Sequence, residues 1–392
     1  MQGPPGSGKT WTGAQIAAHL LRLGKRVGVV APTHKAIHNL LDEIEVVASP
    51  VRALKKCSAG DPDTKYEGAW IENEDELAPF LDRDVRLLAG TAWLFAREEL
   101  NAELDVLVID EAGQMSLADA LAVGTAAHNL VLLGDPLQLA QVSQGVHPGG
   151  TGCSVLEHLL GDDATVPPDR GLFLERTRRM HPEVCRFVSE VIYDGRLLPL
   201  EGLERQRVEG IGAGIRHLAV EHDGNSQASP EEADAIAAEI ELLVGREYTL
   251  ADGLRRPLRH EEVMVVAPYN MQVRCLRARL PEAVRVGTVD KFQGQQAPVV
   301  FYSTTSSSGT EIPRGLEFLL SRNRLNVAIS RAQCLAYLVG NPRLLDVRCR
   351  TVEQMRMANA LCRAVEMAEG QPTLFLARPG GDPESMPLRT KE

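Results

Sequence analysis

Cysteine is scarce in this sequence and never occurs at metal-binding spacing. The 392 residues include seven cysteines, and no two of them form a C-x-x-C pair. Structural zinc sites and iron–sulfur clusters are built from closely spaced cysteines, so the sequence favours neither of them. Scattered thiols are typical of a reducing compartment, and we therefore expect a cytoplasmic protein.

Long apolar runs and excess basic charge are also lacking. No stretch approaches the roughly eighteen uninterrupted apolar residues of a membrane span, and no signal-peptide pattern opens the sequence, so we expect no membrane partner. Lysine and arginine number 42 against 53 aspartates and glutamates, which gives a net charge of -11. This balance argues against a protein that coats nucleic acid by bulk electrostatics, but it leaves room for a local basic groove.

What the sequence does contain is an alternation of strand-like and helical segments. In the first half, apolar runs recur at residues 27–32, 87–91, 106–110 and 130–135. This rhythm is typical of a parallel sheet with crossover helices. Residues 46–85 show little periodicity, and we interpret them as a reduced insertion at the sheet edge.

A second α/β series begins near residue 175. Ser229, Pro230 and Glu232 have the spacing of a capping box at the start of one of its helices. A last helical stretch at 351–368 precedes a tail rich in Pro, Gly and charge, which we expect to be disordered. We predict helices over residues 181–192 and 229–244 and strands over residues 217–222, 263–269, 284–290, 298–305 and 334–341.

Length and pattern together define the expected fold class. With 44% apolar content, 392 residues can bury two cores of ordinary size, and a single compact domain is less favoured. We therefore predict an α/β protein with two tandem domains and mostly parallel sheets. The first domain covers residues 1–175, the second covers residues 176–350, and residues 351–392 form a C-terminal helix and tail.

A glycine-rich loop near the start is the strongest functional signal. Its glycines permit a turn whose backbone N–H groups wrap phosphates, its lysine reaches the β- and γ-phosphate oxygens, and its hydroxyl binds Mg²⁺. A helical pattern follows, so the phosphates also meet a helix N-terminus. The alternative is a Gly/Lys run that arose by chance in an arbitrary loop. The predicted phosphate-binding residues are Gly3, Pro4, Pro5, Gly6, Ser7, Gly8, Lys9 and Thr10.

Two acids follow a buried strand about a hundred residues later. The apolar run 106–109 ends in Asp110 and Glu111, as expected of a central parallel strand that delivers carboxylates to its C-terminal edge. Asp110 would bind Mg²⁺ together with Thr10, and Glu111 would polarise the attacking water. Acids that merely cap a following helix are the alternative. Paired with the loop, the acids make hydrolysis of ATP or GTP the leading hypothesis.

Glutamine and arginine positions suggest that hydrolysis is coupled to the second domain. Gln138 follows another central strand, where it could sense the γ-phosphate. Arg179 opens the second half, and Arg324 and Arg331 are two helical turns apart, which predicts a shared helix face. Arginines from a second domain could clamp the transition-state charge, although solvated arginines on amphipathic helices are the common alternative.

Seven motifs follow one another through roughly residues 1–350, and these are GPPGSGKT, APTHKA, VIDEAGQ, GDPLQL, RRMHP, TVDKFQGQ and RLNVAISRA. In content and order the chain resembles the superfamily 1 helicases, in particular the branch that translocates 5′ to 3′ and includes the nonsense-mediated-decay helicase. Residues 287–307 and 321–339 look closer still to bacterial proteins in which a RecB-like nuclease precedes such a helicase. The resemblance implies two tandem RecA-like P-loop domains.

The resemblance also implies roles for individual residues. ATP and Mg²⁺ would be the cofactors, Glu111 the catalytic base, Gln138 the γ-phosphate sensor, and Arg179 and Arg331 the arginine fingers. Single-stranded DNA, or RNA, would lie across both domains, with contacts mostly to phosphate and sugar. The implied contact residues are Thr33, Lys35, Gly90, Thr91, Pro268, Tyr269 and Thr288.

Three features depart from the family pattern. Arg178 stands where an aromatic residue is usual and could stack on adenine, and Gln296 stands where an acid is common and could bind a ribose hydroxyl. The central strand that precedes the loop in the family is missing, since only Met1 and Gln2 come before the loop. We therefore expect the C-terminal part of a longer protein with a nuclease domain upstream, or a truncated reading frame.

The leading hypothesis is an ATP-dependent helicase or translocase on single-stranded nucleic acid, DNA more than RNA. The competing hypothesis is a nucleotide-dependent switch, or an inactive fragment of a larger nuclease-helicase, that binds ATP without unwinding. ATP hydrolysis that rises on adding single strands would separate the two.

Overall fold

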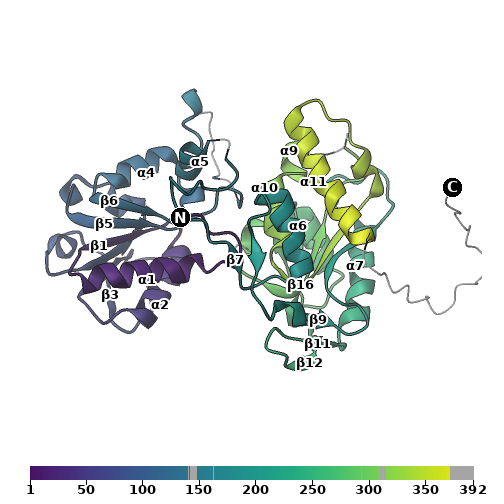
Figure 1. The fold of residues 1–392 in the computed structure, drawn as a ribbon, viewed down its shortest axis with the longest axis horizontal. Coiled ribbons are helices and arrows are strands. Elements are labelled where there is room, and N and C mark those ends of the chain that lie inside the picture. The colour runs from purple at the N-terminus through teal and green to yellow at the C-terminus, as the bar shows by residue number, and fades with distance from the viewer. Residues whose placement is uncertain are drawn as a thin grey trace, which may run out of the picture.

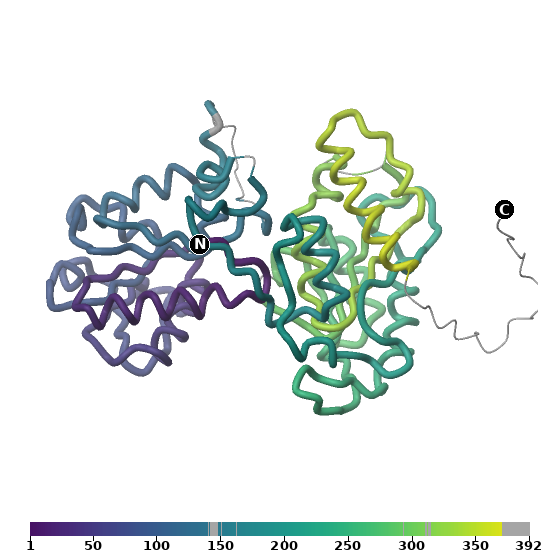
Figure 2. Tube along the Cα trace, in the orientation of Figure 1, coloured from purple at the N-terminus to yellow at the C-terminus, as the bar shows by residue number. Residues whose placement is uncertain are grey.

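The computed structural model describes residues 1–139, 141, 148–161, 163–292, 294–309, 312 and 315–370. These residues form two lobes, each built on a sheet with helices on both faces (Figure 1). The N-terminus lies at the side of the first lobe that is nearer the second, as the purple start of the chain in Figure 2 shows. The tail that we expect to be disordered lies outside the described residues.

The first lobe is built on a six-stranded sheet in which every neighbouring pair of strands is parallel. The strand order is β3-β2-β4-β1-β5-β6, so β1 and β5 lie side by side in the interior. Both are almost wholly buried and apolar, as expected of parallel strands covered on both faces. The six strands are β1 (Val27–Val30), β2 (Ala53–Lys56), β3 (Ile71–Glu74), β4 (Leu87–Gly90), β5 (Leu104–Ile109) and β6 (Ala127–Leu132).

Helices cover both faces of this sheet and give each face its own core. Val27 and Val29 of β1 pack in the cluster under α1 and α2, whereas Val30 packs in the cluster on the other face. This is the alternation that a pleated strand imposes. The helices are α1 (Lys9–Arg22) and α2 (His34–Val47) on one face, and α3 (Ala92–Phe95), α4 (Leu117–Gly124) and α5 (Val155–Leu160) on the other.

The predicted insertion at residues 46–85 does lie at the sheet edge, but it is not merely an insertion. It contributes β2 and β3, which extend the sheet beyond β4. Each of these strands has only four residues, and each carries charged side chains, so neither produces a readable apolar period. The sequence therefore placed this segment correctly and missed its strands.

The opposite edge of the sheet is formed by β6. Three of its residues are exposed, and Leu130 is 45% exposed. Past the end of β6 the first residues of the chain continue the pairing, since Gly3 N donates to Gly134 O at 2.9 Å and Gln2 N donates to Leu172 O at 2.8 Å. The approach to the glycine-rich loop thus lies between residues 132–134 and residues 172–174, in line with the strands of the sheet.

The second lobe is built on a five-stranded parallel sheet with the order β10-β16-β15-β13-β14. Its strands are β10 (Gly214–Ala219), β13 (Val263–Ala267), β14 (Arg285–Thr288), β15 (Ala297–Ser303) and β16 (Ala332–Gly340). Four of them match predicted runs, whereas β10 begins and ends three residues before the predicted run 217–222. Two small sheets were not predicted. They consist of β7 (Arg176–Thr177) with β8 (Leu198–Pro199), and of β9 (Arg207–Val208), β11 (Glu247–Thr249) and β12 (Arg255–Pro257).

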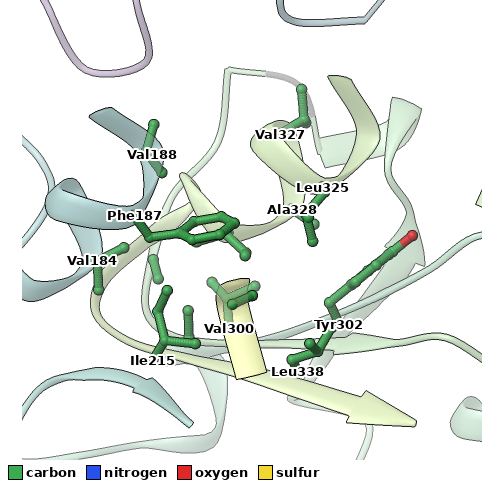
Figure 3. Packing of buried hydrophobic residues seen from close by; sticks show 14 of the residues in the cluster. Val184, Phe187, Val188, Ile215, Val300, Tyr302, Leu325, Val327, Ala328 and Leu338 are labelled. Carbon is green, nitrogen blue, oxygen red and sulfur yellow. The ribbon is translucent and has the colours of Figure 1, made fainter. Parts of the chain in front are cut away.

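Helices also sandwich the second sheet. Phe187 of α6 lies among aliphatic side chains from the sheet and from α10, including Val300 and Ala328 (Figure 3). One face is covered by α6 (Pro182–Ile192), α9 (Leu316–Leu319), α10 (Arg322–Ile329) and α11 (Val352–Glu369), and the other by α7 (Pro230–Leu243) and α8 (Asn270–Arg277). No helix among the described residues is both long enough and apolar enough to span a membrane.

The predicted capping box of α7 is half correct. Ser229 is the N-cap, and its hydroxyl accepts from the backbone N–H of Glu232 at 3.1 Å. The carboxylate of Glu232 does not return to the cap, because it is fully buried and accepts from the Ser303 hydroxyl at 2.5 Å and from the Thr305 N–H at 2.9 Å. It instead joins α7 to the end of β15, and Gln272 of α8 accepts from the Ser229 N–H in its place.

Candidate nucleotide site at the contact between the lobes

The glycine-rich loop has the backbone that a phosphate site requires. Gly6 and Gly8 have positive φ angles of 73° and 81°, a conformation that glycine adopts without a steric penalty. Gly8 is the N-cap of α1, and no side chain caps the helix there. The first N–H groups of α1 therefore remain open to an anion, and the buried hydroxyl of Ser7 has no hydrogen-bond partner among the described residues.

Lys9 joins the loop to the two acids at the end of β5. Its Nζ lies 2.9 Å from Oε1 of Glu111 and 3.4 Å from Oδ1 of Asp110. Burial by itself would lower the pKa of Lys9, but the two carboxylates outweigh burial and raise it above its usual value. Burial has the opposite effect on Asp110: it disfavours the charged carboxylate and raises the pKa, while the positive charge of Lys9 opposes this rise. The predicted lysine and acids thus meet, although about a hundred residues separate them in the sequence.

Glu111 has a left-handed backbone, with φ 52° and ψ 39°. This conformation is costly for a glutamate and places it in the small class of strained positions that cluster at functional sites. Its backbone N–H donates to Oδ1 of Asp110 at 2.8 Å, which fixes the Asp110 carboxylate against the backbone of Glu111. Thr10, the second predicted Mg²⁺ ligand, is half-buried in the first turn of α1.

A magnesium ion at this position would need more than protein side chains. Among the described residues, no group of three or more His, Cys, Asp and Glu side chains is placed to hold a metal. Mg²⁺ is commonly bound in nucleotide sites through one or two protein oxygens, with phosphate and water completing the shell. One buried carboxylate and one hydroxyl, Asp110 and Thr10, fit that pattern.

The second lobe begins directly against the loop. Thr177 Oγ1 donates to Pro5 O at 3.0 Å, and Arg178 N donates to Gly6 O at 2.8 Å. A Cβ atom on Gly6 would lie 2.6 Å from Cβ of Arg179, so only glycine permits this approach. The segment that carries the predicted arginine finger is therefore held on the phosphate loop itself.

Arg179 and Arg331 lie together on the second-lobe side of the site. Arg179 Nη1 donates to Ser330 O at 3.0 Å, and burial, followed by the charge of Arg331, lowers the pKa of Arg179 to about 9. Burial also lowers the pKa of Arg331 to about 10, while the carboxylate of Glu111 opposes the change. Both arginines remain cationic at neutral pH. Nη2 of Arg331 is buried without a hydrogen-bond partner among the described residues.

The predicted shared helix face of Arg324 and Arg331 is wrong. α10 ends at Ile329, so Arg331 lies beyond the helix, where its Nε donates to Val327 O at 3.1 Å. Arg324 turns elsewhere, with its guanidinium 4.3 Å from the Phe318 ring centre and 3.5 Å from Oδ2 of Asp290. The seven-residue spacing does not give the two arginines a shared helix face, because the helix ends before Arg331.

Gln138 lies behind the loop, where its Nε2 donates to Asp135 Oδ2 at 2.9 Å and is 3.5 Å from Gly3 O. Asp135 is the centre of a buried network that sequence reasoning did not foresee. Its Oδ2 also accepts from the Tyr193 hydroxyl at 2.5 Å, and that hydroxyl accepts from Asn326 Nδ2 at 2.9 Å. Burial raises the pKa of Asp135, and its hydrogen bonds oppose the rise.

The Asp135 network crosses from one lobe to the other. Asn326 Nδ2 also donates to Leu137 O at 2.8 Å, and Asn323 of the same helix donates to Pro136 O at 3.0 Å. Helix α10 is therefore bonded to the loop that carries Gln138. The asparagine within the RLNVAISRA motif was the available signal for this contact, whereas Tyr193 follows the last turn of α6 without a distinctive pattern around it.

A cavity beside the glycine-rich loop is the candidate position for a nucleotide base. This cavity has a volume of about 720 Å³, within the range of small-ligand sites, and is lined by Ser7, Gly8, Trp11 and Arg178. Trp11 is 51% exposed there, and sequence reasoning did not single it out. Gln296 does not reach this cavity lining, because its Oε1 accepts from Arg179 Nε at 2.8 Å.

The predicted strand-contact residues of the first lobe gather at the C-terminal edge of its sheet. Thr33 and Lys35 are exposed at the start of α2, and the Thr33 hydroxyl caps that helix by accepting from Ala36 N at 3.2 Å. Gly90 ends β4, where a Cβ atom would lie 2.8 Å from a methyl of Leu94. Thr91 follows as the N-cap of α3, and no side-chain cap bond engages its hydroxyl.

In the second lobe the corresponding residues are more enclosed. Tyr269 is 6% exposed, and its ring lies 5.4 Å from that of Phe318, so the ring contributes to packing. Pro268 is buried beside it, and Thr288 is half-buried at the end of β14. The two lobes nevertheless share a cavity of about 250 Å³. Its lining includes Thr33, Lys35 and Glu111 from the first lobe and Asp290 and Lys291 from the second.

Comparisons with known proteins agree with this arrangement of two P-loop lobes. Two protein-family models, each described as an AAA domain, match residues 1–149 and residues 152–343. Relatives include a regulator of nonsense transcripts 1 homolog from Drosophila melanogaster, 26% identical over 88% of this chain and 33% of its own length. The DNA replication ATP-dependent helicase/nuclease JHS1 from Arabidopsis thaliana is 25% identical over 88% of this chain and 27% of its own length.

Fold and matches together define a protein with tandem nucleotide-binding lobes. Along most of its length the chain is similar to helicases of superfamily 1. It spans about a third or less of the length of the two relatives named. Among solved structures, an Arterivirus nonstructural protein 10 (helicase) in complex with DNA is 16% identical and covers 87% of this chain and 60% of its own, with a TM-score of 0.48.

Proposed function

We propose that this chain is an ATP-driven translocase or helicase that moves along single-stranded nucleic acid, DNA in the first place. The observation that carries the proposal is the contact of the second lobe with the phosphate loop, at Pro5 and Gly6, beside the half-buried Arg179 and the buried Arg331. A nucleotide bound there would be touched by both lobes. Its binding and hydrolysis would therefore change the relation between the lobes, which is what a motor requires.

In the proposed reaction the loop holds the phosphates, and Lys9 exchanges its carboxylate partners for phosphate oxygens. Mg²⁺, held through Thr10 and Asp110, would supply positive charge to the phosphate oxygens. Glu111 accepts a proton from the attacking water, and Arg179 and Arg331 neutralise the developing charge. Arg331 is suited to this role because its Nη2 is buried without a partner among the described residues.

Gln138 and its neighbours would report the nucleotide state to the second lobe. Gln138 shares the carboxylate of Asp135 with Tyr193, whose hydroxyl in turn bonds to Asn326 of α10. A γ-phosphate that recruits Gln138 would remove one donor from Asp135 and change the strength of the bond to Tyr193. The network thus offers a physical route from the phosphate to the second lobe.

A single strand would lie in the cavity between Thr33 and Lys35 on one lobe and Lys291 on the other. Lys35 and Lys291 offer cationic partners to the phosphates, next to Glu111 and Asp290 in the same lining and despite a net charge of -11 for the whole chain. The names of the relatives include a DNA helicase/nuclease, which supports the further proposal that this motor works beside a nuclease domain. A cytoplasmic location is part of the same proposal, and the scattered cysteines of the chain support it.

The test is an ATPase assay with and without single-stranded DNA and single-stranded RNA. We expect a basal rate that rises when DNA is added and a smaller rise with RNA. Lys9→Ala serves as the blank, because it removes the cation that pairs with Asp110 and Glu111. ATP hydrolysis that proceeds at the same rate with and without either strand would contradict the motor and favour the nucleotide-dependent switch.

Tyr193→Phe should weaken the stimulation of ATP hydrolysis by single strands about tenfold. The substitution removes one hydroxyl from the network between Asp135 and Asn326, and hydrogen bonds to charged groups contribute about 1.5–3 kcal/mol each. The measurement is the ratio of stimulated to basal rate at saturating strand. Tyr302→Phe is the control, because its buried hydroxyl donates to Leu319 O within the second lobe. Equal ratios for the two variants would exclude the cross-lobe role.

A further inference from the structure

An exposed tryptophan stands at the strand-binding edge of the first lobe without a structural reason for its position. Trp93 is 87% exposed, whereas the next two residues of α3, Leu94 and Phe95, are 1% and 0% exposed. The short helix is therefore anchored by its other side chains, and Trp93 contributes little to the core. A large aromatic side chain that gains little from burial is suited to a ligand instead.

Trp93 lines a cavity of about 390 Å³, and this volume lies within the range of small-ligand sites. The cavity is mostly apolar, with Ala31, Pro32 and Met115 among its other lining residues. It also holds one unsatisfied polar group, because Nε2 of Gln114 is buried and has no hydrogen-bond partner among the described residues. A buried amide without a partner costs free energy, so it favours a ligand that can accept its hydrogen bond.

The charged residues of its lining distinguish this cavity from the adjacent cavity between the lobes. Its ten lining residues include Asp119 but no lysine or arginine. The lining of the adjacent cavity between the lobes contains two cations, Lys35 and Lys291, together with the acids Glu111 and Asp290. A phosphate finds cationic partners only in the second cavity, whereas an uncharged aromatic base suits the first.

The two cavities also adjoin each other. Pro32 and Gln114 line both of them, and Thr91 of the Trp93 cavity is one of the predicted strand contacts. A strand whose phosphates lie along Thr33 and Lys35 therefore has a base pocket within reach of its backbone. Gln114 links this pocket to the nucleotide site, since its N–H donates to Glu111 O at 2.8 Å.

We propose that Trp93 and Gln114 form a pocket for one nucleobase of the bound strand, with the base stacked on the indole and hydrogen-bonded to the amide. The inference rests on the proposed function, because it assumes that a single strand lies along this edge. Stacking on an indole accepts every base, so the pocket would hold the strand without selecting a sequence. Because Gln114 adjoins Glu111, a base in the pocket would also order the catalytic segment.

The experiment compares two strands of equal length, oligothymidylate and an abasic strand with the same phosphates. Trp93→Ala should weaken binding of oligothymidylate about 5- to 150-fold and leave binding of the abasic strand unchanged. Trp93→Phe should restore most of the lost affinity, because its ring still stacks. Leu23→Ala is the matched control, since Leu23 is 62% exposed on the same lobe at the end of α1.

A spectroscopic readout complements the affinities. The chain has three tryptophans, so Trp11→Phe with Trp70→Phe leaves Trp93 as the sole indole. Its fluorescence should be quenched by oligothymidylate and not by the abasic strand. Equal weakening of both strands by Trp93→Ala, or no weakening of either, would overturn the base pocket while the motor stands. A wild-type chain that binds neither strand, and whose rate of ATP hydrolysis is the same with and without them, would instead overturn the proposed function.

Discussion

Replacing Arg331 by alanine should lower kcat for ATP hydrolysis by about 10³- to 10⁵-fold, the range found when arginine fingers are removed. Arg331 is 2% exposed and retains one buried nitrogen, Nη2, without a hydrogen-bond partner among the described residues. The carboxylate of Glu111 raises the pKa of Arg331 against the effect of burial, so the guanidinium is placed to interact with this acid of the first lobe. The affinity for ATP should change much less, because the charge that the guanidinium neutralises is greatest in the transition state.

Two further variants make this result specific. Arg331→Lys keeps a positive charge but loses the planar fork that donates to Val327 O and Gln295 O, so it should recover only a small part of the lost rate. Arg343→Ala is the matched control, because Arg343 is an exposed arginine of the same lobe that pairs with Asp223 at the surface. An Arg331→Ala enzyme that retains a tenth or more of the wild-type kcat would exclude the finger role.

The geometry of the candidate nucleotide site could be predicted from the sequence because its parts obey local rules. The glycine spacing requires a turn, and the apolar run before Asp110 requires a buried parallel strand. Since parallel strands present their C-terminal ends at one edge, the loop and the acids must meet there. The ion pairs from Lys9 to Asp110 and Glu111 show that they do.

The cross-lobe network could not be predicted in the same way. Tyr193 and Asn326 are neither evenly spaced nor part of an apolar period that points to Asp135. Their meeting depends on how α6 and α10 pack on the second sheet and how that lobe lies on the first. Both arrangements depend on tertiary packing, which a local sequence pattern does not reveal. Tertiary packing also explains why the Glu232 carboxylate bonds to residues at the end of β15 and not to the N-cap of α7.

Short elements were the other limit of sequence reasoning. β2 and β3 have four residues each, which is too few for an alternating pattern to stand out against charged side chains. The same limit applies to α10, whose eight residues end before Arg331. Trp93 illustrates a different limit, because only coordinates show that its side chain is exposed while its neighbours are buried.

Glu111→Gln should reduce kcat for ATP hydrolysis by about 10²- to 10⁴-fold and leave ATP binding nearly intact. The amide keeps the size and the hydrogen-bonding oxygen of the side chain but cannot accept a proton from water at neutral pH. It also removes one of the two carboxylates that pair with Lys9, so the Lys9 cation becomes more available to phosphate. The measurements are single-turnover hydrolysis and equilibrium binding of ATP.

Glu99→Gln is the matched control, because Glu99 is an exposed glutamate that precedes the same strand, β5, at the end remote from the site. It should hydrolyse ATP at close to the wild-type rate. Glu111→Gln also separates the motor from the switch, since a motor needs a hydrolysis step for every advance along the strand. If Glu111→Gln bound ATP, failed to hydrolyse it and still moved along or unwound nucleic acid, hydrolysis would not drive movement. A variant that hydrolysed ATP at the wild-type rate would show that Glu111 is not the base.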